Sequence, residues 1–140
     1  MPSDDLDPFS VDADLLGRVS LLAVAGEEDI VVRSRGQGET TEVFLGIYSR
    51  GDLNAYAFLT APGAVSLKGD THWALAGPIA QADADVEVTI EGKPAQEVNV
   101  SDSAWLSVVP ASERATAAGV VLRYPGRIRR HRVRLPRILP

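Results

Sequence analysis

The chain consists largely of short runs rich in valine, isoleucine and aromatic residues, separated by Gly, Pro, Asp and Asn. In the clearest run, residues 86–91, valine or isoleucine alternates with glutamate or threonine. The turn residues 92–94 follow, and a return run passes through Val98 and Val100, which predicts a hairpin with one face in solvent. Because the runs are spaced too closely for helices of ordinary length, the pattern predicts an all-β protein.

Several other runs have the length and composition of strands. The last two are joined by Pro125-Gly126, where proline presets φ and glycine accepts the positive φ of a type II turn. Residues 11–25 fit either a helix or a strand, and we favour a short helical turn that leads into a strand. Residues 34–41 are rich in Gly, Ser, Thr and charge, which indicates a loop. The further expected strands are 30–33, 73–79, 104–109, 119–124 and 128–135.

Residues 43–48 and 55–59 differ from the other runs because they are apolar at both odd and even positions. This pattern predicts a hairpin buried on both faces, with a loop centred on Gly51-Asp52. We therefore expect truncation of Phe58 to cost as much stability as truncation of a core phenylalanine, about 3 to 5 kcal/mol. The expected cross-strand pairs are Ile47 with Tyr56, Leu45 with Phe58, Phe44 with Leu59, and Tyr48 near Ala55.

Together these elements predict a β-sandwich, immunoglobulin-like in general architecture, with about nine to eleven short antiparallel strands. We expect one β-sandwich domain at residues 11–140, preceded by a flexible acidic arm at residues 1–10. This arm either moves freely or lies on the basic strand described below. The cysteine pair of antibody domains is missing, and Trp105 is the candidate for the core tryptophan.

Composition narrows the possible chemistry. The absence of cysteine excludes disulfides, thiolate catalysis and thiolate metal sites. The aspartates among residues 4–14 do not have the spacing of an EF-hand, so we expect neither a metal nor a cofactor. No signal sequence or apolar span is apparent, and we expect a cytoplasmic protein that does not enter a membrane. Twelve arginines against two lysines are typical of a GC-rich bacterial genome.

Charge is distributed unevenly along the chain. Up to Glu113 there are nineteen acidic and six basic residues, an excess of thirteen negative charges, whereas the eight basic residues after Glu113 have no acid among them. In a strand, side chains alternate between faces, so three of these arginines are expected in one row at about 6.6 Å spacing. The candidate residues for binding an anion or a partner are Arg127, Arg129, Arg130, Arg132 and Arg134.

The arginine segment has two interpretations. A row of guanidinium groups can bind phosphates, sulfated sugars or carboxylates. The interpretation that we favour is structural: the arginines pair with the chain's own acids, such as Glu87 and Glu91, or protect a sheet edge. Nucleic-acid binding is the weaker alternative, because the remainder of the chain is acidic and no aromatic residues are interleaved with the arginines.

A second, weaker candidate is the pair Asp70 and His72. These residues are two apart, so in a strand they point to the same side and can form an acid–imidazole pair of the kind that orients a general base. The competing interpretation is a histidine at a strand edge beside the buried Trp73. No hydrolase or phosphate-binding motif accompanies the pair.

From these observations we expect a non-catalytic interaction module that binds a protein partner or assembles with itself. The alternatives are anion or nucleic-acid binding through the arginine strand, and a small hydrolase-like enzyme around Asp70 and His72. The basis for the first choice is the lack of any motif for catalysis, metals or nucleotides.

Overall fold

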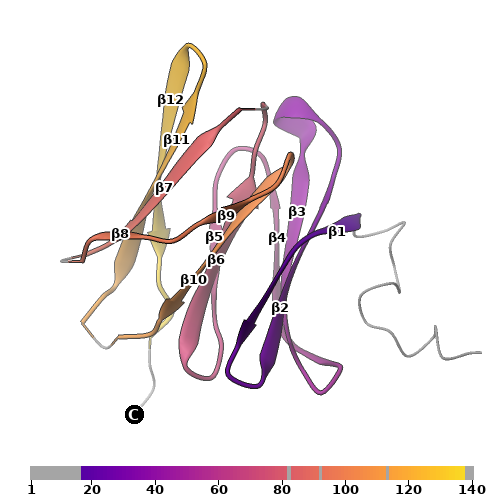
Figure 1. The fold of residues 1–140 in the computed structure, drawn as a ribbon, viewed down its shortest axis with the longest axis vertical. Coiled ribbons are helices and arrows are strands. Elements are labelled where there is room, and N and C mark those ends of the chain that lie inside the picture. Colours follow the sequence, from indigo (N-terminus) through magenta and orange to yellow (C-terminus); the bar gives the residue numbers. More distant parts are fainter. Residues whose placement is uncertain (1–16, 82, 92, 113, 138–140) are drawn as a thin grey trace, which may run out of the picture.

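The computed structural model describes residues 17–81, 83–91, 93–112 and 114–137, and these residues form an all-β protein with no α-helix. Twelve strands make three antiparallel sheets of four (Figure 1). Sheet A has the order β1 (Arg18–Ala25), β2 (Glu28–Arg35), β3 (Glu42–Ser49) and β4 (Asp52–Thr60). Sheet B has the order β5 (Val65–Lys68), β6 (His72–Pro78), β10 (Ala104–Pro110) and β9 (Asn99–Val100). Sheet C has the order β12 (Arg127–Arg134), β11 (Ala117–Tyr124), β7 (Asp85–Ile90) and β8 (Ala95–Gln96).

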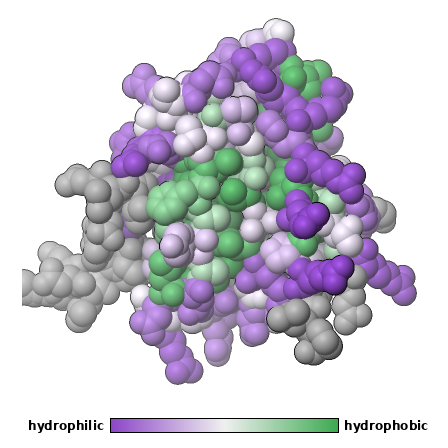
Figure 2. Space-filling view, turned by 180° about the vertical axis from the view of Figure 1, so that it is seen from behind, coloured by the Kyte–Doolittle hydropathy of each residue, from purple (hydrophilic) through white to green (hydrophobic). Residues whose placement is uncertain are grey.

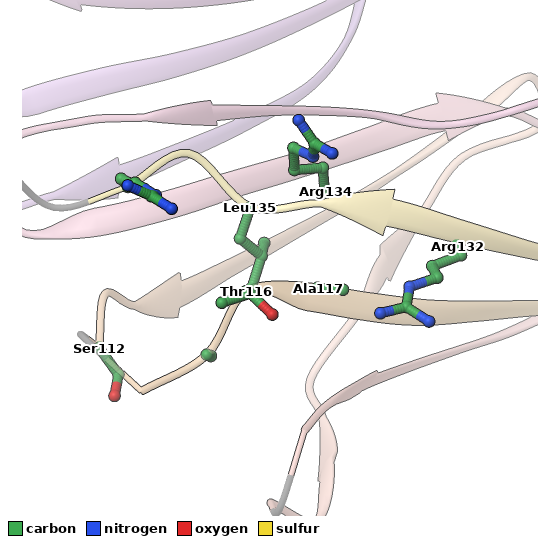
Figure 3. Close-up of a pocket in the computed structure, with 8 residues that line it drawn as sticks. Ser112, Thr116, Ala117, Arg132, Arg134 and Leu135 are labelled. Atoms are coloured by element: carbon green, nitrogen blue, oxygen red, sulfur yellow. The ribbon is translucent and has the colours of Figure 1, made fainter.

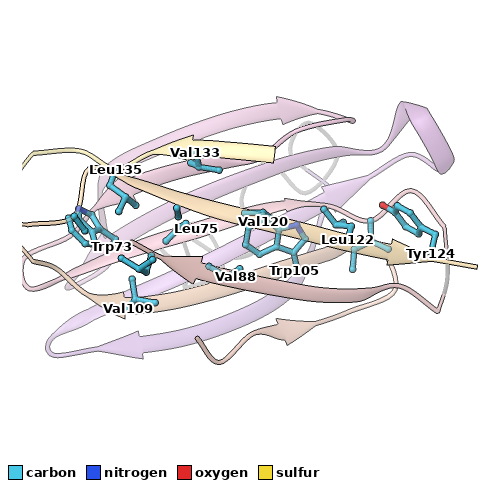
Figure 4. Packing of buried hydrophobic residues seen from close by; sticks show 14 residues of the cluster. Trp73, Leu75, Val88, Trp105, Val109, Val120, Leu122, Tyr124, Val133 and Leu135 are labelled. Atoms are coloured by element: carbon cyan, nitrogen blue, oxygen red, sulfur yellow. The ribbon is translucent and has the colours of Figure 1, made fainter. Parts of the chain in front are cut away.

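Sheet B is the middle layer, because its two long strands contribute to both hydrophobic cores. In β6, Trp73 and Leu75 belong to the core shared with sheet C, whereas Ala74 and Ala76 belong to the core shared with sheet A. The same alternation holds in β10, where Trp105 faces sheet C and Leu106 faces sheet A. Figure 4 shows the core between sheets B and C, with both tryptophans in it. Trp105 is thus buried, as the sequence predicted.

Most of the expected strands are present. The runs expected at 30–33, 73–79, 104–109, 119–124 and 128–135 correspond to β2, β6, β10, β11 and β12. Gly126 has a φ of 84°, in agreement with the predicted turn between the last two strands. Residues 18–25 of the ambiguous segment form β1. Its residues 11–16 and the acidic arm expected at 1–10 lie outside the described residues.

The hairpin expected at residues 86–100 is only partly formed. β7 pairs with the short β8 through Val88–Gln96 and Thr89–Ala95, and the chain then crosses to sheet B, where β9 pairs with β10. The longer ladder of β7 is with β11, whose apolar side chains complete the core. The return run therefore divides into two strands, which is one reason why the strands exceed the predicted number.

The hairpin of β3 and β4 forms with a register different from the expected one. Phe44 pairs with Phe58, and Gly46 pairs with Tyr56. The turn is centred on Arg50-Gly51, both of which have positive φ, rather than on Gly51-Asp52. A one-residue shift in register moves side chains to the opposite face, so Tyr56 and Phe58 do not share a face with Leu45.

This register corrects the predicted burial of β4. Val43, Leu45 and Ile47 face the core between sheets A and B, and all are buried. In contrast, Phe58 is 53% exposed and Tyr56 is 58% exposed, on the outer face of sheet A. β3 is buried on both faces and β4 is not, so the prediction that Phe58 is a core residue is wrong.

The register leads to a paired test of stability. Replacing Leu45, which is fully buried, with alanine should lower the free energy of unfolding by about 2 to 5 kcal/mol, because a cavity remains. Replacing the exposed Phe58 with alanine should cost less than about 1 kcal/mol. Urea denaturation of both variants checks this, and an equal loss in the two would contradict the register.

Candidate anion-binding face of sheet C

The arginine segment forms β12, an edge strand of sheet C, and its side chains divide by parity. Val133 and Leu135 belong to the core between sheets B and C, so the odd-numbered residues of this strand face inward. The even-numbered residues Ile128, Arg130, Arg132 and Arg134 lie on the outer face and are exposed. The sequence predicted this division of faces, and the two groups have different surroundings.

The inward arginines contact an acidic residue in a turn that follows β2 of sheet A. Arg127 Nη2 lies 3.0 Å from Glu39 Oε1, and Arg129 Nη2 lies 3.9 Å from the same oxygen. Glu39 belongs to a single 3-10 turn, η2 (Gly38–Thr40), which follows β2 of sheet A. The guanidinium of Arg127 also lies over the ring of Tyr124, 5.0 Å from its centroid. These arginines therefore pair with an acid of the chain, although the acid is Glu39 and not Glu87.

His131 lies on the same inward side. Burial lowers its pKa below the usual histidine value, and the positive charge of Arg129 lowers the pKa further. Of these two causes, burial is the larger one. The neutral ring is thus the form that the folded protein favours.

The outward arginines lie beside a strand of small residues. Along the outer face, Arg134 pairs with Ala117, Arg132 with Gly119, and Arg130 with Val121. On the other side of β11, the outer face of β7 has acidic and polar residues, in which Thr89 pairs with Gly119 and Glu87 with Val121. A row of cations and a row of acids thus run parallel, two strands apart, with the small residues Ala117 and Gly119 between them at one end and Arg123 at the other.

One end of this face is an open groove. Its polar lining consists of Arg132, Arg134 and Arg137 and the hydroxyl-bearing residues Ser112 and Thr116. In Figure 3 the Arg132 side chain lies along β11 near Ala117, whereas Arg134 extends away from that strand. Guanidinium and hydroxyl groups are all hydrogen-bond donors, so the groove suits a carboxylate or another oxyanion.

The outward arginines are engaged only weakly with the chain's own acids. Arg132 Nη2 lies 3.7 Å from Glu91 Oε1, and the Arg132 side chain is 80% exposed, so this pair adds little stability. Arg130 and Arg134 have no ion pair among the described residues. Glu87, which we expected to pair with the segment, instead lies 3.6 Å from Arg123 of β11. The structural interpretation therefore applies mainly to the inward arginines.

The second candidate pair is placed at the start of β6. His72 is half-buried, and its Nδ1 lies 2.6 Å from the Oγ1 of Thr71. The backbone N–H of Asp70 donates to Glu28 Oε1 over 2.7 Å. No hydrogen bond joins Asp70 to His72 in the described part of the chain, and neither residue lines the groove of sheet C.

Among the described residues there is no group of three or more histidine or carboxylate residues that can hold a metal ion. The same residues form no helix long and apolar enough to cross a membrane. Comparisons with protein-family models, with curated proteins and with solved structures gave no match.

Sequence reasoning missed the residues that make the site a groove. Ala117 and Gly119 carry no functional group, and only their position between charged strands gives them significance. Ser112 and Thr116 lie in the loop before β11 and match no motif. Glu39 was missed because it is 88 residues from Arg127, and only the layered fold brings the two together.

The pKa of His131 predicts a pH dependence of stability. Because the folded-state pKa lies below the unfolded value of about 6.5, the unfolded chain binds more protons as the pH falls through that value. The folded protein should therefore lose stability between pH 7.5 and 5.5, a range chosen above ordinary carboxylate pKa values. The variant His131→Asn should show a smaller decrease in thermal midpoint over this range. An unchanged decrease would mean that His131 does not titrate as described.

Proposed function

We propose that this protein is a non-catalytic binding module that engages an extended acidic segment of a protein partner through the outward arginines of β12. The observation that carries the proposal is the division of the segment by parity. Arg127 and Arg129 contact Glu39, while Arg130 and Arg134 are exposed and have no ion pair among the described residues. If these arginines served folding alone, we would expect acidic side chains of the same chain to lie beside them.

The edge position of β12 favours an extended partner. Among the described residues β12 pairs in sheet C with β11 alone, so its other edge can accept an added strand. The outward arginines recur at every second residue, which matches the spacing of alternate side chains in an extended partner. Acidic side chains on that strand would lie opposite the arginines, as in favourable cross-strand pairs.

The end of β12 limits where such a strand can lie. Ser66 of β5 donates a hydrogen bond of 2.5 Å to the backbone carbonyl of Arg134, so this carbonyl already has a partner. The edge that remains for a partner is the earlier part of the strand, Arg127–Arg132. A bound segment of about five residues would cover it and place its acids against Arg130 and Arg132.

The acidic row on β7 argues against nucleic acid. Asp85 and Glu87 of β7 lie two strands from β12, and Glu91, just after β7, lies 3.7 Å from Arg132, so a broad polyanion would meet both charges. No aromatic side chain lies among the outward residues of β12 to stack a base. A narrow acidic strand at the sheet edge meets only the cations.

Other parts of the sequence-based picture remain predictions beside this proposal. These are the immunoglobulin-like sandwich arrangement and the cytoplasmic location. Three sheets with two cores are compatible with a sandwich plus a further layer, and β12 is an edge strand in either description. The proposal therefore does not depend on the fold family.

The test is binding of a labelled peptide with alternating glutamate and threonine, measured by fluorescence anisotropy at low and at physiological salt. The double variant Arg130→Gln, Arg132→Gln should raise the Kd at least about tenfold, equivalent to about 1.4 kcal/mol. The loss should be smaller at higher salt, because exposed charges are screened.

The matched control is the double variant Arg18→Gln, Arg50→Gln, which removes the same charge from sheet A and its turn. It should change the Kd less than about twofold. Equal losses in the two double variants would show that net charge alone drives binding and would defeat the proposal. Tighter binding to DNA of similar charge than to the peptide would favour the nucleic-acid alternative.

A further inference from the structure

A second surface lies on the opposite layer of the molecule, at the edge strand β4 of sheet A. Over its nine residues, Asp52 is the only charged side chain, and there is no lysine or proline. Natural sheets usually protect such an edge with charges, proline or bulges. The bulge in β4 lies near its beginning, between the positions that pair with Ile47 and Tyr48, so residues 55–60 carry no bulge, charge or proline. β5 of sheet B lies close to β4 but shares no ladder with it.

Two aromatic side chains stand on the outer face of this edge. Tyr56 is 58% exposed and Phe58 is 53% exposed, and their ring centroids are 5.9 Å apart. Both rings rest on the buried Phe44 of β3, at centroid distances of 6.0 Å and 5.1 Å. Contact with Phe44 restricts both rings. Burying their exposed surfaces in an interface therefore costs little additional side-chain conformational entropy.

Apolar surface is not confined to these two rings. Figure 2 shows a continuous apolar area in the middle of the face behind Figure 1, with hydrophilic residues around it. An apolar area with a polar rim is the arrangement found at protein interfaces.

We propose that two copies of this chain associate by antiparallel pairing of their β4 strands about a two-fold axis. An edge strand whose apolar residues are two apart is complementary to itself in this arrangement. With Ala57 opposite the partner's Ala57, Tyr56 lies opposite the partner's Phe58, and the same pair forms again across the axis. The two sheets A become one sheet of eight strands, in which the Tyr56 and Phe58 rings of both copies lie side by side on one face.

The charge of β4 is compatible with this register. In it, each Asp52 lies opposite the region beyond the end of the partner's strand, so the two acids are far from the axis and from each other. No other charged side chain of β4 enters the interface. A second copy therefore meets an apolar strand with no like charges beside it, whereas a charged partner would find no counter-charge there.

The association uses sheet A and is independent of the arginines in sheet C. The first experiment is sedimentation equilibrium, in which the unchanged chain should be a dimer at about 100 μM. The double variant Tyr56→Lys, Phe58→Lys should be a monomer at that concentration, because each lysine faces another across the axis. The matched control, Leu22→Lys with Val24→Lys, replaces two exposed apolar residues on the other edge of sheet A and should stay dimeric.

A second measurement avoids the lysine substitutions, which could disturb folding of β4. The chain has no cysteine, so Ala57→Cys introduces a single thiol, which in the proposed register faces the same thiol of the partner. Mild oxidation should give a covalent dimer with this variant and much less with Asn54→Cys, whose thiol would face position 60 of the partner. The variant Arg130→Gln, Arg132→Gln should cross-link like the unchanged background when it carries Ala57→Cys.

The proposal fails if the unchanged chain is a monomer at about 100 μM. It also fails if the β1 variant is monomeric while the β4 variant is dimeric, since the other edge would then carry the interface. Cross-linking that is equal at positions 54 and 57 would exclude the register. Loss of peptide binding with the dimer intact would defeat only the proposed function.

Discussion

Burial of sheet B on both faces is the constraint on which the rest of the structure depends. A sheet that places Trp73, Leu75 and Trp105 on one face and Leu106 on the other loses a large hydrophobic contribution unless both faces are covered. Sheets A and C supply the two covers. Each of them has one face committed to a core. The outer face of β12 in sheet C is exposed, whereas in sheet A β3 is buried on both faces and the exposed side chains are on the edge strand β4.

Because sheet C is an outer layer, neighbouring residues of β12 face either the core or the solvent. In β12 an inward arginine reaches Glu39 and the ring of Tyr124, while the next residue along the chain faces solvent. The same segment therefore contributes both to holding the layers and to the exposed cationic row. The acidic and basic parts of the chain do not attract each other over their whole surfaces. The arginines of β12 form only a few specific ion pairs, with Glu39 and Glu91 among the described residues.

Sequence alone predicted what depends on local pattern, and it failed where the register of a hairpin or a contact between distant segments decides. Strands and the turn at Pro125-Gly126 follow from alternation and backbone preference, and the alternation of arginines in β12 follows from the period of a strand. The placement of Phe58 was wrong because the register depends on whether the turn centres on Arg50-Gly51 or one residue later. Both alternatives have the same composition, and only the folded hairpin distinguishes them. The groove and the contact with Glu39 were beyond reach because each joins residues from different sheets or loops.

Gly119 influences where the side chain of Arg132 lies on the outer face of sheet C. A Cβ at this position would lie 3.2 Å from the hydroxyl oxygen of Thr89, so the site is already narrow, and the missing side chain leaves a low path across β11. Arg132 pairs with Gly119 across the ladder and reaches Glu91 beyond it. Glycine at position 119 thus leaves space for Arg132 to reach across β11 to Glu91. With glycine the guanidinium can lie flat towards its intramolecular acid, whereas a larger side chain would make it stand away from the sheet. Evolution could therefore adjust the number of arginines available to a partner without changing any charged residue.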